Sequence, residues 1–469
     1  MRYELRITGK FYEQLREHLF PKDSKEAAAI LLCGRHETKA ISILLSHKIL
    51  LIPYDECRRG KDYITWKMDR VLPFLEEVEK RNLAILKIHS HPGGYNKFST
   101  IDDKSDHEFF TTAFNWSETN SVHGSAIMLP DGRMIGRVFN KKLHSMEMDK
   151  ISVASNSILI WRKEIHQEIE AFDDEFSLRT RQVLGDGTYS ILRKLRIGVI
   201  GCSGTGSPTI EQLYRLGVGH LLLIDPDKVE EKNLNRIIQA ILSDAKKGRY
   251  KTAVLAEAIE RAGLGTTVEV KSVNLFDSKD AILELIQCDI IFGCVDRAET
   301  RHLLNQIANF YLIPYFDMGV QITADKKGGI ESMSGTGHYI QPGLSSLLSR
   351  NLYTPARLEA EGLQRKNPEE YTRRLKAGYI QNAEVERPAV LPINMLMSSM
   401  TVIDFLNRIH LKPFKEDNPD FYARMLMDYT ANCTENKSES KFEIDAAAAK
   451  FAGRGDCKPF LRMPQLENL

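Results

Sequence analysis

The chain has little that would direct it to a membrane or to a nucleic acid. Its first twenty residues, MRYELRITGKFYEQLREHLF, are interrupted by charged side chains and lack the apolar core of a signal peptide. The most apolar long stretch, residues 388–406, contains Pro, Asn, Ser and Asp, so it predicts a buried helix rather than a membrane span. A formal net charge of +1 gives no electrostatic argument for nucleic acid or an anionic membrane. We therefore expect a cytoplasmic protein that binds neither.

Cysteine and sequence repetition are also scarce. The seven cysteines are an odd number without regular spacing, which argues against a disulfide framework and fits free thiols in a reducing compartment. There is no internal repeat and no long low-complexity tract apart from AAAA at 446–449. With 469 residues the chain is too long for one ordinary core, so we expect two domains.

The first part of the chain, residues 1–150, predicts a mixed α/β domain. Short apolar runs predict strands at 40–52, 83–89, 125–130 and 133–139. The last two flank Asp131-Gly132, which is typical of a hairpin turn. Helical periodicity predicts helices over 9–19 and 68–81, and a charged helical linker over 151–180.

The pattern changes after Leu195. Short apolar runs alternate with helical segments, which indicates βαβ units and a largely parallel sheet. We expect a second α/β domain over 181–412 that ends in a helix over 388–411, followed by a poorly patterned tail over 413–469.

A group of metal-binding residue types stands in HSHPGGYNKFSTID, residues 89–102. On a strand, His89 and His91 point to the same face and can share a metal. Asp102 would be a third ligand, and three protein ligands with an open fourth position are the catalytic arrangement of zinc. Two histidines alone also fit a polar loop after a strand.

The full spacing is more specific. His-Ser-His-Pro, six residues, Ser99, two residues and Asp102, with Glu26 upstream in SKEAAAILLCG, resembles the JAMM (JAB/MPN) metalloprotease motif. The resemblance implies that residues 1–150 form a zinc isopeptidase domain with zinc on His89, His91 and Asp102. It implies that Glu26 is the general base and that Ser99 stabilises an oxyanion or orients the site. Members of this family cleave after the C-terminal glycine of ubiquitin-like proteins.

A glycine-rich loop lies between a predicted strand and a predicted helix in GVIGCSGTGSPTIEQLYRLG, residues 198–217. Gly201, Gly204 and Gly206 allow a tight turn and a close approach to phosphate, and the following helix offers free N–H groups. The next strand ends in Asp225, at the spacing of a ribose contact. A dehydrogenase would share these features.

The sequence that follows separates the two possibilities. HLLLIDPDKVEEKNLNR, residues 220–236, resembles the ThiF/MoeB-like activating enzymes for ubiquitin-like proteins, which have a Rossmann-like fold. The resemblance implies an adenylyltransferase in which Arg236 and Lys251 neutralise ATP phosphates and Asp296 holds Mg²⁺. The implied ATP-binding residues are Gly201, Gly204, Gly206, Asp225, Asp227, Asn233, Arg236, Lys251 and Asp296.

An arginine precedes this domain. The segment RTRQ, residues 179–182, resembles the Arg-Gln entry sequence of the same family, in which the arginine reaches the ATP of the other protomer. The resemblance therefore implies that Arg181 acts across a homodimer. The alternative is an ordinary ion pair, for example with Asp174 on the same arm.

The chain departs from the family pattern at its cysteines. It has none between Cys294 and Cys433, where ubiquitin-activating enzymes carry the catalytic thiol. Ser346 and Ser349 stand at the first of two expected Cys-x-x-Cys zinc pairs, and AAAA stands at the second. Three alternatives follow for the acyl group: no covalent intermediate, an oxyester on Ser346 or Ser349, or a thioester on Cys433 or Cys457.

Together these features predict a bifunctional enzyme of a bacterial ubiquitin-like conjugation pathway. One half would activate the C-terminal glycine of a ubiquitin-like protein with ATP and Mg²⁺, and the zinc half would process or deconjugate it. A conjugating enzyme is the expected further partner. The alternatives are sulfur-carrier activation and maturation in cofactor or sulfur metabolism, and a non-enzymatic binding module.

Overall fold

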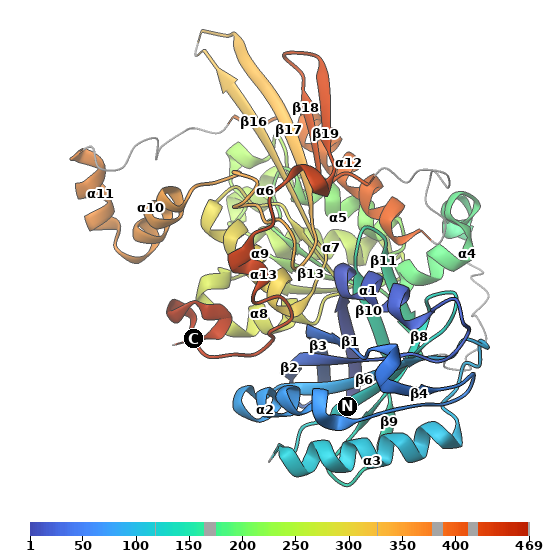
Figure 1. Ribbon diagram of the computed structural model, residues 1–469. Helices are drawn as coiled ribbons and strands as arrows, with labels where there is room; N and C mark the ends of the chain where they lie inside the picture. Colours follow the sequence, from blue (N-terminus) through green and yellow to red (C-terminus); the bar gives the residue numbers. More distant parts are fainter. Residues whose placement is uncertain (118, 164–174, 326, 378–387, 411–420, 468–469) are drawn as a thin grey trace. The chain divides into compact units, whose positions relative to one another are not determined.

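The computed structural model describes residues 1–117, 119–163, 175–325, 327–377, 388–410 and 421–467 (Figure 1). The chain divides into two compact units. Unit 1 contains Met1–Glu170, Asn309–Leu312 and Ala449–Arg462, and unit 2 contains Ala171–Ala308, Ile313–Ala448 and Met463–Leu469. No helix within the described residues is both long enough and apolar enough to cross a membrane.

Unit 1 is built on a nine-stranded mixed sheet in the order β11-β10-β1-β3-β2-β6-β7-β8-β9. Its strands are β1 Arg2–Thr8, β2 Ala28–Glu37, β3 Ile41–Leu51, β6 Ala84–Ser90, β7 His123–Met128, β8 Met134–Phe139, β9 Ser145–Glu147, β10 Lys150–Ala154 and β11 Ile158–Arg162. A small separate pair joins β4 Cys57–Arg59 to β5 Ile64–Trp66. The helices are α1 Gly9–Leu19, α2 Leu72–Arg81 and α3 Thr100–Trp116.

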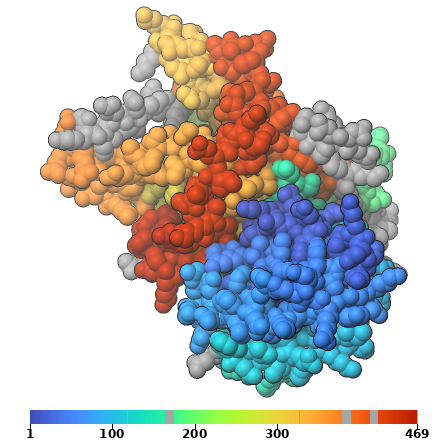
Figure 2. Space-filling model, viewed as in Figure 1, coloured from blue at the N-terminus to red at the C-terminus, as the bar shows by residue number. Residues whose placement is uncertain are grey.

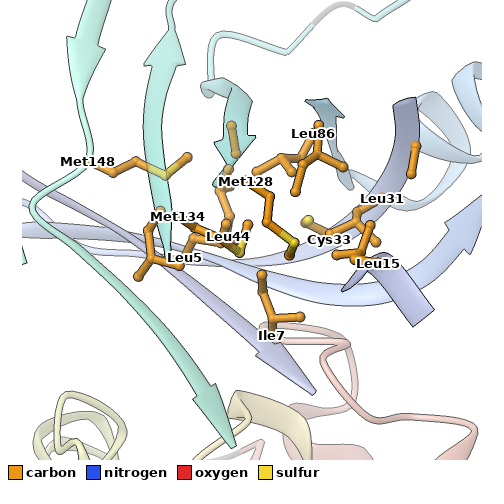
Figure 3. Packing of buried hydrophobic residues seen from close by; sticks show 14 of the residues in the cluster. Leu5, Ile7, Leu15, Leu31, Cys33, Leu44, Leu86, Met128, Met134 and Met148 are labelled. Carbon is orange, nitrogen blue, oxygen red and sulfur yellow. The ribbon is translucent and has the colours of Figure 1, made fainter. Parts of the chain in front are cut away.

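Buried apolar side chains from these elements form the core of unit 1. Alternate residues of the strands pack with the apolar stripe of α1 in one buried cluster, in which Leu31 and Cys33 of β2 lie beside Leu15 of α1 (Figure 3). A second cluster contains buried residues of α2 and α3, among them Leu75 and Phe110. The predicted hairpin is confirmed, since β7 pairs antiparallel with β8 and Gly132 takes a positive φ of 86° in the turn.

The prediction of a helical linker over 151–180 is wrong for its first part. Residues 150–162 form β10, parallel to β1, and β11, antiparallel to β10. The charged tract that suggested a helix begins only at Arg162, whereas ISVASNSILI before it is apolar and β-branched, as a strand requires. Residues 164–174 lie outside the described part of the chain.

The segment after residue 413 is not a separate tail. Arg424–Asp428 and Cys433–Lys437 are strands β18 and β19 of unit 2, and residues 449–462 belong to unit 1. There the N–H of Asp456 donates to the carbonyl of Arg35 at 2.8 Å. A Cβ on Gly455 would lie 2.3 Å from that carbonyl oxygen, so only glycine allows this approach.

Unit 2 contains an eight-stranded sheet in the order β14-β13-β12-β15-β16-β17-β18-β19. The first five strands are parallel: β14 Thr267–Lys271, β13 His220–Ile224, β12 Arg196–Ile200, β15 Ile290–Gly293 and β16 Tyr315–Ala324. Then β17, Ile330–Ile340, and the two strands after it pair antiparallel. The helices are α4 Leu178–Lys194, α5 Gly206–Arg215, α6 Leu242–Lys247, α7 Lys251–Ala262, α8 Lys279–Ile286, α9 Ala298–Tyr311, α10 Pro355–Lys366, α11 Pro368–Lys376, α12 Leu391–Ile409 and α13 Ala446–Ala449.

The parallel part of this sheet confirms the predicted alternation of strands and helices. Its chain order reverses between β12 and β15, because the chain first adds β13 and β14 on one side and then β15 and β16 on the other. In open α/β sheets of this Rossmann type, ligands bind outside the carboxyl ends of the strands at such a reversal. A ligand site in unit 2 is therefore expected at the segments that follow β12, β13 and β15.

Candidate functional site

Three metal-binding side chains of unit 1 converge where β6 ends. His89 is near the end of β6, His91 follows the strand, and Asp102 lies in the first turn of α3. The Nε2 atom of His89 is 3.1 Å from Nε2 of His91 and 3.0 Å from Oδ1 of Asp102. Oδ2 of Asp102 lies 3.4 Å from Nε2 of His91. All three residues are buried, and their candidate ligand atoms lie within 4.8 Å of one another.

Ser99 positions Asp102 through the N-terminus of α3. The Ser99 Oγ accepts a hydrogen bond from the Asp102 N–H at 3.2 Å, and the Ser99 N–H donates to Asp102 Oδ2 at 2.6 Å. This reciprocal pair is a capping box, which fixes the first turn of a helix. The structure therefore gives Ser99 an orienting contact with the candidate ligand.

Glu26 lies beside the three side chains, just before β2. Its backbone N–H donates to the carbonyl of Gly60 at 2.8 Å, and its side chain is almost completely buried. Oε1 of Glu26 is 4.0 Å from Nε2 of His91. Burial raises the pKa of Glu26 to about 7, although the nearby His91 opposes the rise.

This donor set fits zinc. Two imidazole nitrogens and one carboxylate oxygen are the ligand types of catalytic zinc sites. Burial lowers the pKa of His89, which favours the neutral imidazole that a metal requires. Among the described residues, His89, His91 and Asp102 are the His, Cys, Asp or Glu side chains whose ligand atoms lie close enough together to hold a metal ion.

Buried charges beneath the cluster were not anticipated from the sequence. Lys87 Nζ lies 2.8 Å from Asp106 Oδ1, and Arg137 Nη2 lies 2.8 Å from the other oxygen of Asp106. A signal was present, because Lys87 is two residues before His89 on a strand and Asp106 is four residues after Asp102 on a helix. Residues at these spacings share a face of the strand or helix, so these two charges belong to the same faces of β6 and α3 as His89 and Asp102.

The glycine loop of unit 2 runs from the end of β12 to the start of α5. Gly201 has φ of 91°, and a Cβ there would lie 2.4 Å from the carbonyl oxygen of Cys294. A Cβ on Gly206 would lie 1.8 Å from the carbonyl oxygen of Gly201. Gly204 faces Asn394 of α12, whose Nδ2 would be 2.7 Å from an added Cβ. The loop is closed tightly, and the first N–H groups of α5 are at its end.

Asp225 joins this loop to the end of β13. Its Oδ2 accepts from the N–H of Cys202 at 2.7 Å, and its Oδ1 accepts from the N–H of Asp227 at 2.8 Å. Lys251, at the start of α7, places Nζ 2.7 Å from Asp227 Oδ2 and 3.9 Å from Asp225 Oδ1. Burial raises the pKa of Asp225, and the Lys251 ammonium opposes this. The structure thus brings Asp225, Asp227 and Lys251 together beside the loop.

The other residues expected at the ATP site have distinct surroundings. Asn233 is buried, and its Oδ1 accepts from the N–H of Glu230 at 3.1 Å. Arg236 donates to the carbonyl of Lys232 at 3.0 Å, and its Cδ would be 3.3 Å from a Cβ on Gly204. Asp296 is exposed in the loop after β15, the strand next to β12. Arg236 and Asp296 therefore belong to segments that meet at the glycine loop.

Arg181 has partners on its own arm. Its Nε donates to Oγ of Ser177 at 3.0 Å, and its Nη1 lies 3.2 Å from Oδ1 of Asp186. The acidic partner of Arg181 in its own chain is therefore Asp186. Asp174, the partner suggested by the sequence, lies outside the described residues.

Ser346 and Ser349 are held in a local hydrogen-bond network. Ser346 Oγ donates to Oδ2 of Asp445 at 2.6 Å, and Ser349 Oγ donates to the carbonyl of Glu443 at 3.0 Å. The N–H of Ser346 also donates to Ser349 Oγ at 3.0 Å. These contacts fasten the turn after Gly343 to residues 443–445.

The two candidate thiols differ in exposure. Cys433 is exposed at the start of β19 in unit 2, whereas Cys457 is half-buried in unit 1. Burial raises the pKa of Cys457, which disfavours the nucleophilic thiolate.

Comparison with known proteins finds several relatives that match part of this chain. A ubiquitin-like modifier-activating enzyme 5 from Drosophila sechellia is 27% identical over 218 residues, which are 43% of this chain and 51% of that enzyme. The enzyme of the same name from Aedes aegypti is 24% identical over 269 residues, 54% of this chain and 65% of its own. The chain thus spans about half the length of the first of these relatives.

Matches among solved structures include Escherichia coli MccB, at 16% identity and a TM-score of 0.44 over 62% of this chain and 75% of that one. The ThiF family model matches residues 177–432. That range is more than half of the chain and contains the glycine loop, Asp225, Lys251 and Asp296. The chain therefore belongs to the ThiF family.

Proposed function

We propose that the chain is a bifunctional enzyme acting on the C-terminal glycine of a ubiquitin-like protein. Unit 2 would activate this glycine with ATP, and unit 1 would hydrolyse the bond that follows it. Family membership of residues 177–432 supports the first activity, and the grouping of His89, His91, Asp102 and Glu26 supports the second. The named relatives activate ubiquitin-like modifiers, which suggests the substrate class.

The observation that carries the adenylation half is the position of Asp225, Lys251 and the glycine loop at the sheet reversal. In the proposed reaction a glycine carboxylate oxygen attacks the α-phosphorus of ATP, and the bond to pyrophosphate breaks. The loop N–H groups and the N-terminus of α5 would bind phosphate oxygens. Lys251 and Arg236 would offset the negative charge that moves onto the departing pyrophosphate.

Mg²⁺ would be held by Asp296 and would neutralise phosphate charge when bound. An exposed carboxylate after β15 fits this role, because oxygen ligands suit Mg²⁺ and the segment lies next to the glycine loop. Asp225 would orient the nucleotide by accepting a hydrogen bond from a ribose hydroxyl. That bond would replace one of the two that Asp225 now accepts from the backbone N–H groups of Cys202 and Asp227.

We propose that the adenylate passes directly to an external acceptor. Ser346 is buried, and its hydroxyl already donates a hydrogen bond to Asp445. The hydroxyl of Ser349 donates a hydrogen bond to the carbonyl of Glu443. Both contacts favour a structural role for this pair over an oxyester. Cys433 is the exposed thiol of unit 2 and is the remaining in-chain acceptor to test. A conjugating enzyme would supply the acceptor in a conjugation pathway, and a sulfur donor would supply it in sulfur-carrier metabolism.

For the hydrolytic half we propose zinc on His89, His91 and Asp102. Zinc would act as a Lewis acid and make water a nucleophile at neutral pH. Glu26 would accept the proton of that water and deliver it to the leaving amine. Its buried carboxylate lies beside the proposed ligands but outside their mutual contacts, as a base requires. Ser99 and the Lys87–Asp106 pair would keep the ligands in place.

Two measurements on the purified chain test the proposal. Metal analysis should find one zinc per chain, and pyrophosphate exchange into ATP should require Mg²⁺ and a ubiquitin-like protein that ends in glycine. Full cleavage of a ubiquitin-like fusion by zinc-free protein would rule out the proposed zinc hydrolysis in unit 1. The absence of exchange with every ubiquitin-like protein that ends in glycine would rule out the proposed adenylation in unit 2. We further propose a homodimer in which Arg181 leaves Asp186 and reaches the partner's nucleotide.

A further inference from the structure

The loop that carries Asp296 is anchored at both of its ends. Residues 294–297 connect β15 to α9. At the strand end, the N–H of Cys294 donates to the carbonyl of Ile200 at 2.7 Å. At the helix end, the N–H of Glu299 donates to Oε2 of Glu361 at 3.0 Å. Asp296 therefore lies between a contact to β12 and a contact to α10.

Glu361 is the cap of α9, although it comes from another helix. The first N–H groups of a helix lack intrahelical acceptors, and a carboxylate there is favoured by the helix dipole. Arg357 Nε lies 3.0 Å from Glu361 Oε1, and Arg297 Nη2 donates to the carbonyl of Glu361 at 3.2 Å. With a side chain only 14% exposed, Glu361 is fixed on three sides.

Arg365, one turn further along α10, forms an ion pair with Glu299, the residue of α9 whose N–H donates to Glu361. Its guanidinium lies 2.6 Å from the carboxylate of Glu299 and stacks over the ring of Phe276 at 4.2 Å. Glu299 is buried, and this ion pair places a positive charge beside its carboxylate. Both the backbone and the side chain of Glu299 are thus held by α10, which with α11 lies at the surface of unit 2 (Figures 1 and 2).

From these contacts we infer that Glu361 is a positioning residue for Asp296. The inference rests on the proposed ATP and Mg²⁺ site. Without the cap, the first turn of α9 would fray, and the loop before it would lose its fixed end. Asp296 is three residues before Glu299, so its carboxylate would then sample positions unsuited to Mg²⁺. The helix pair 355–376 would in this way serve the nucleotide site without touching the nucleotide.

The test uses the full chain with ATP and Mg²⁺ alone. The rise in thermal midpoint on ATP binding is measured against Mg²⁺ concentration, and hydrogen exchange of the peptide covering residues 294–301 is measured without ATP. Glu361→Ala should raise the half-saturating Mg²⁺ concentration about fivefold or more and speed exchange of the Glu299 amide. Glu361→Gln should stay close to wild type, because its amide oxygen still accepts the hydrogen bond. Glu359→Ala, an exposed change on the same helix, is the matched control and should change neither quantity.

The outcomes separate this inference from the function on which it rests. If wild type binds Mg²⁺ and ATP but Glu361→Ala has an unchanged Mg²⁺ requirement, the positioning role is overturned, even where amide exchange is faster. If wild type shows no Mg²⁺-dependent response to ATP, the ATP site itself is overturned, and the positioning role with it. If Glu361→Ala does not fold, Glu361→Asp is used instead. The shorter aspartate keeps the negative charge but moves the carboxylate oxygen away from the N–H of Glu299. An unchanged Mg²⁺ requirement in Glu361→Asp overturns the inference equally.

Discussion

Oε1 of Glu26 lies 4.0 Å from Nε2 of His91, near enough for electrostatic contact but beyond a hydrogen bond. The candidate ligand atoms of His89, His91 and Asp102, in contrast, lie 3.0–3.4 Å from one another. This difference separates a base from the ligands. Variants of Glu26 and His89 should therefore differ in zinc content, which would not be expected if the cluster were only structural.

Glu26→Ala should retain zinc and lose cleavage of a ubiquitin-like fusion by about 10²–10⁴-fold, because a general base contributes that much. His89→Ala should lose both zinc and cleavage, because it removes a ligand. Zinc content by atomic absorption and cleavage on a gel provide the two readouts. Zinc loss in Glu26→Ala, or full cleavage by it, would show that the assigned roles are wrong.

The second expectation concerns adenylation without a thiol. Asp296→Ala should lower pyrophosphate exchange by about 10²-fold or more, since it removes the proposed Mg²⁺ contact and its charge stabilisation. Replacing Cys433 and Cys457 together by Ala should leave exchange at the wild-type rate, because formation of the adenylate needs no nucleophilic sulfur. A folded double variant without exchange would assign the thiols a role in the first step.

The third expectation concerns Arg181, whose guanidinium now pairs with Asp186 at 3.2 Å. Arg181→Ala and Asp296→Ala should each be nearly inactive in exchange. Mixed dimers should recover about a quarter of wild-type activity, because one intact site forms in half of the dimers. Asp186→Ala is the control and should remain active. Dimers that have exchanged subunits without any recovery would restrict Arg181 to its own chain.

A fourth expectation concerns stability in acid. His123 is fully buried in unit 1, and Nδ1 accepts from the N–H of Ile85 at 3.2 Å. Burial holds the pKa of His123 well below its usual value. The unfolded chain therefore binds a proton below about pH 6.5 that the folded chain does not, so stability falls as the pH is lowered.

The corresponding variant is His123→Gln. Between about pH 7.5 and about pH 5.5, wild type should lose about 1 kcal/mol more unfolding free energy than this variant. Urea unfolding at the two pH values measures the difference, and each protein is compared only with itself. Equal losses in the two proteins would mean that His123 is protonated without cost in the folded state.

Local patterns predicted the parts of the fold that local physics determines. Asp131-Gly132 indicated the β7–β8 hairpin, and the apolar periodicity of 9–19 gave α1 with the same bounds. The strands β10 and β11 were mistaken for a helical arm although their sequence is apolar and β-branched. What no local pattern indicates is the parallel pairing of β10 with β1, about 150 positions away. The approach of Gly455 to Arg35 depends on a contact of the same kind.

The sites follow the same division. Motif spacing led to His89, His91, Asp102 and Glu26, which the structure brings together. Glu361 has no sequence signal, because a carboxylate that caps a helix from another helix is recognisable only in three dimensions. The same reason applies to Asn394, which lies on α12 and faces Gly204.

The most direct measurement of the central claim uses two forms of one ubiquitin-like protein, one ending in glycine and one extended beyond it. Pyrophosphate exchange is followed with wild type, Glu26→Ala and Asp296→Ala. If both halves act on the same glycine, wild type should exchange with both forms, Glu26→Ala only with the trimmed form, and Asp296→Ala with neither. Exchange by Glu26→Ala with the extended form at the wild-type rate, or no exchange by wild type with the trimmed form, would contradict the account.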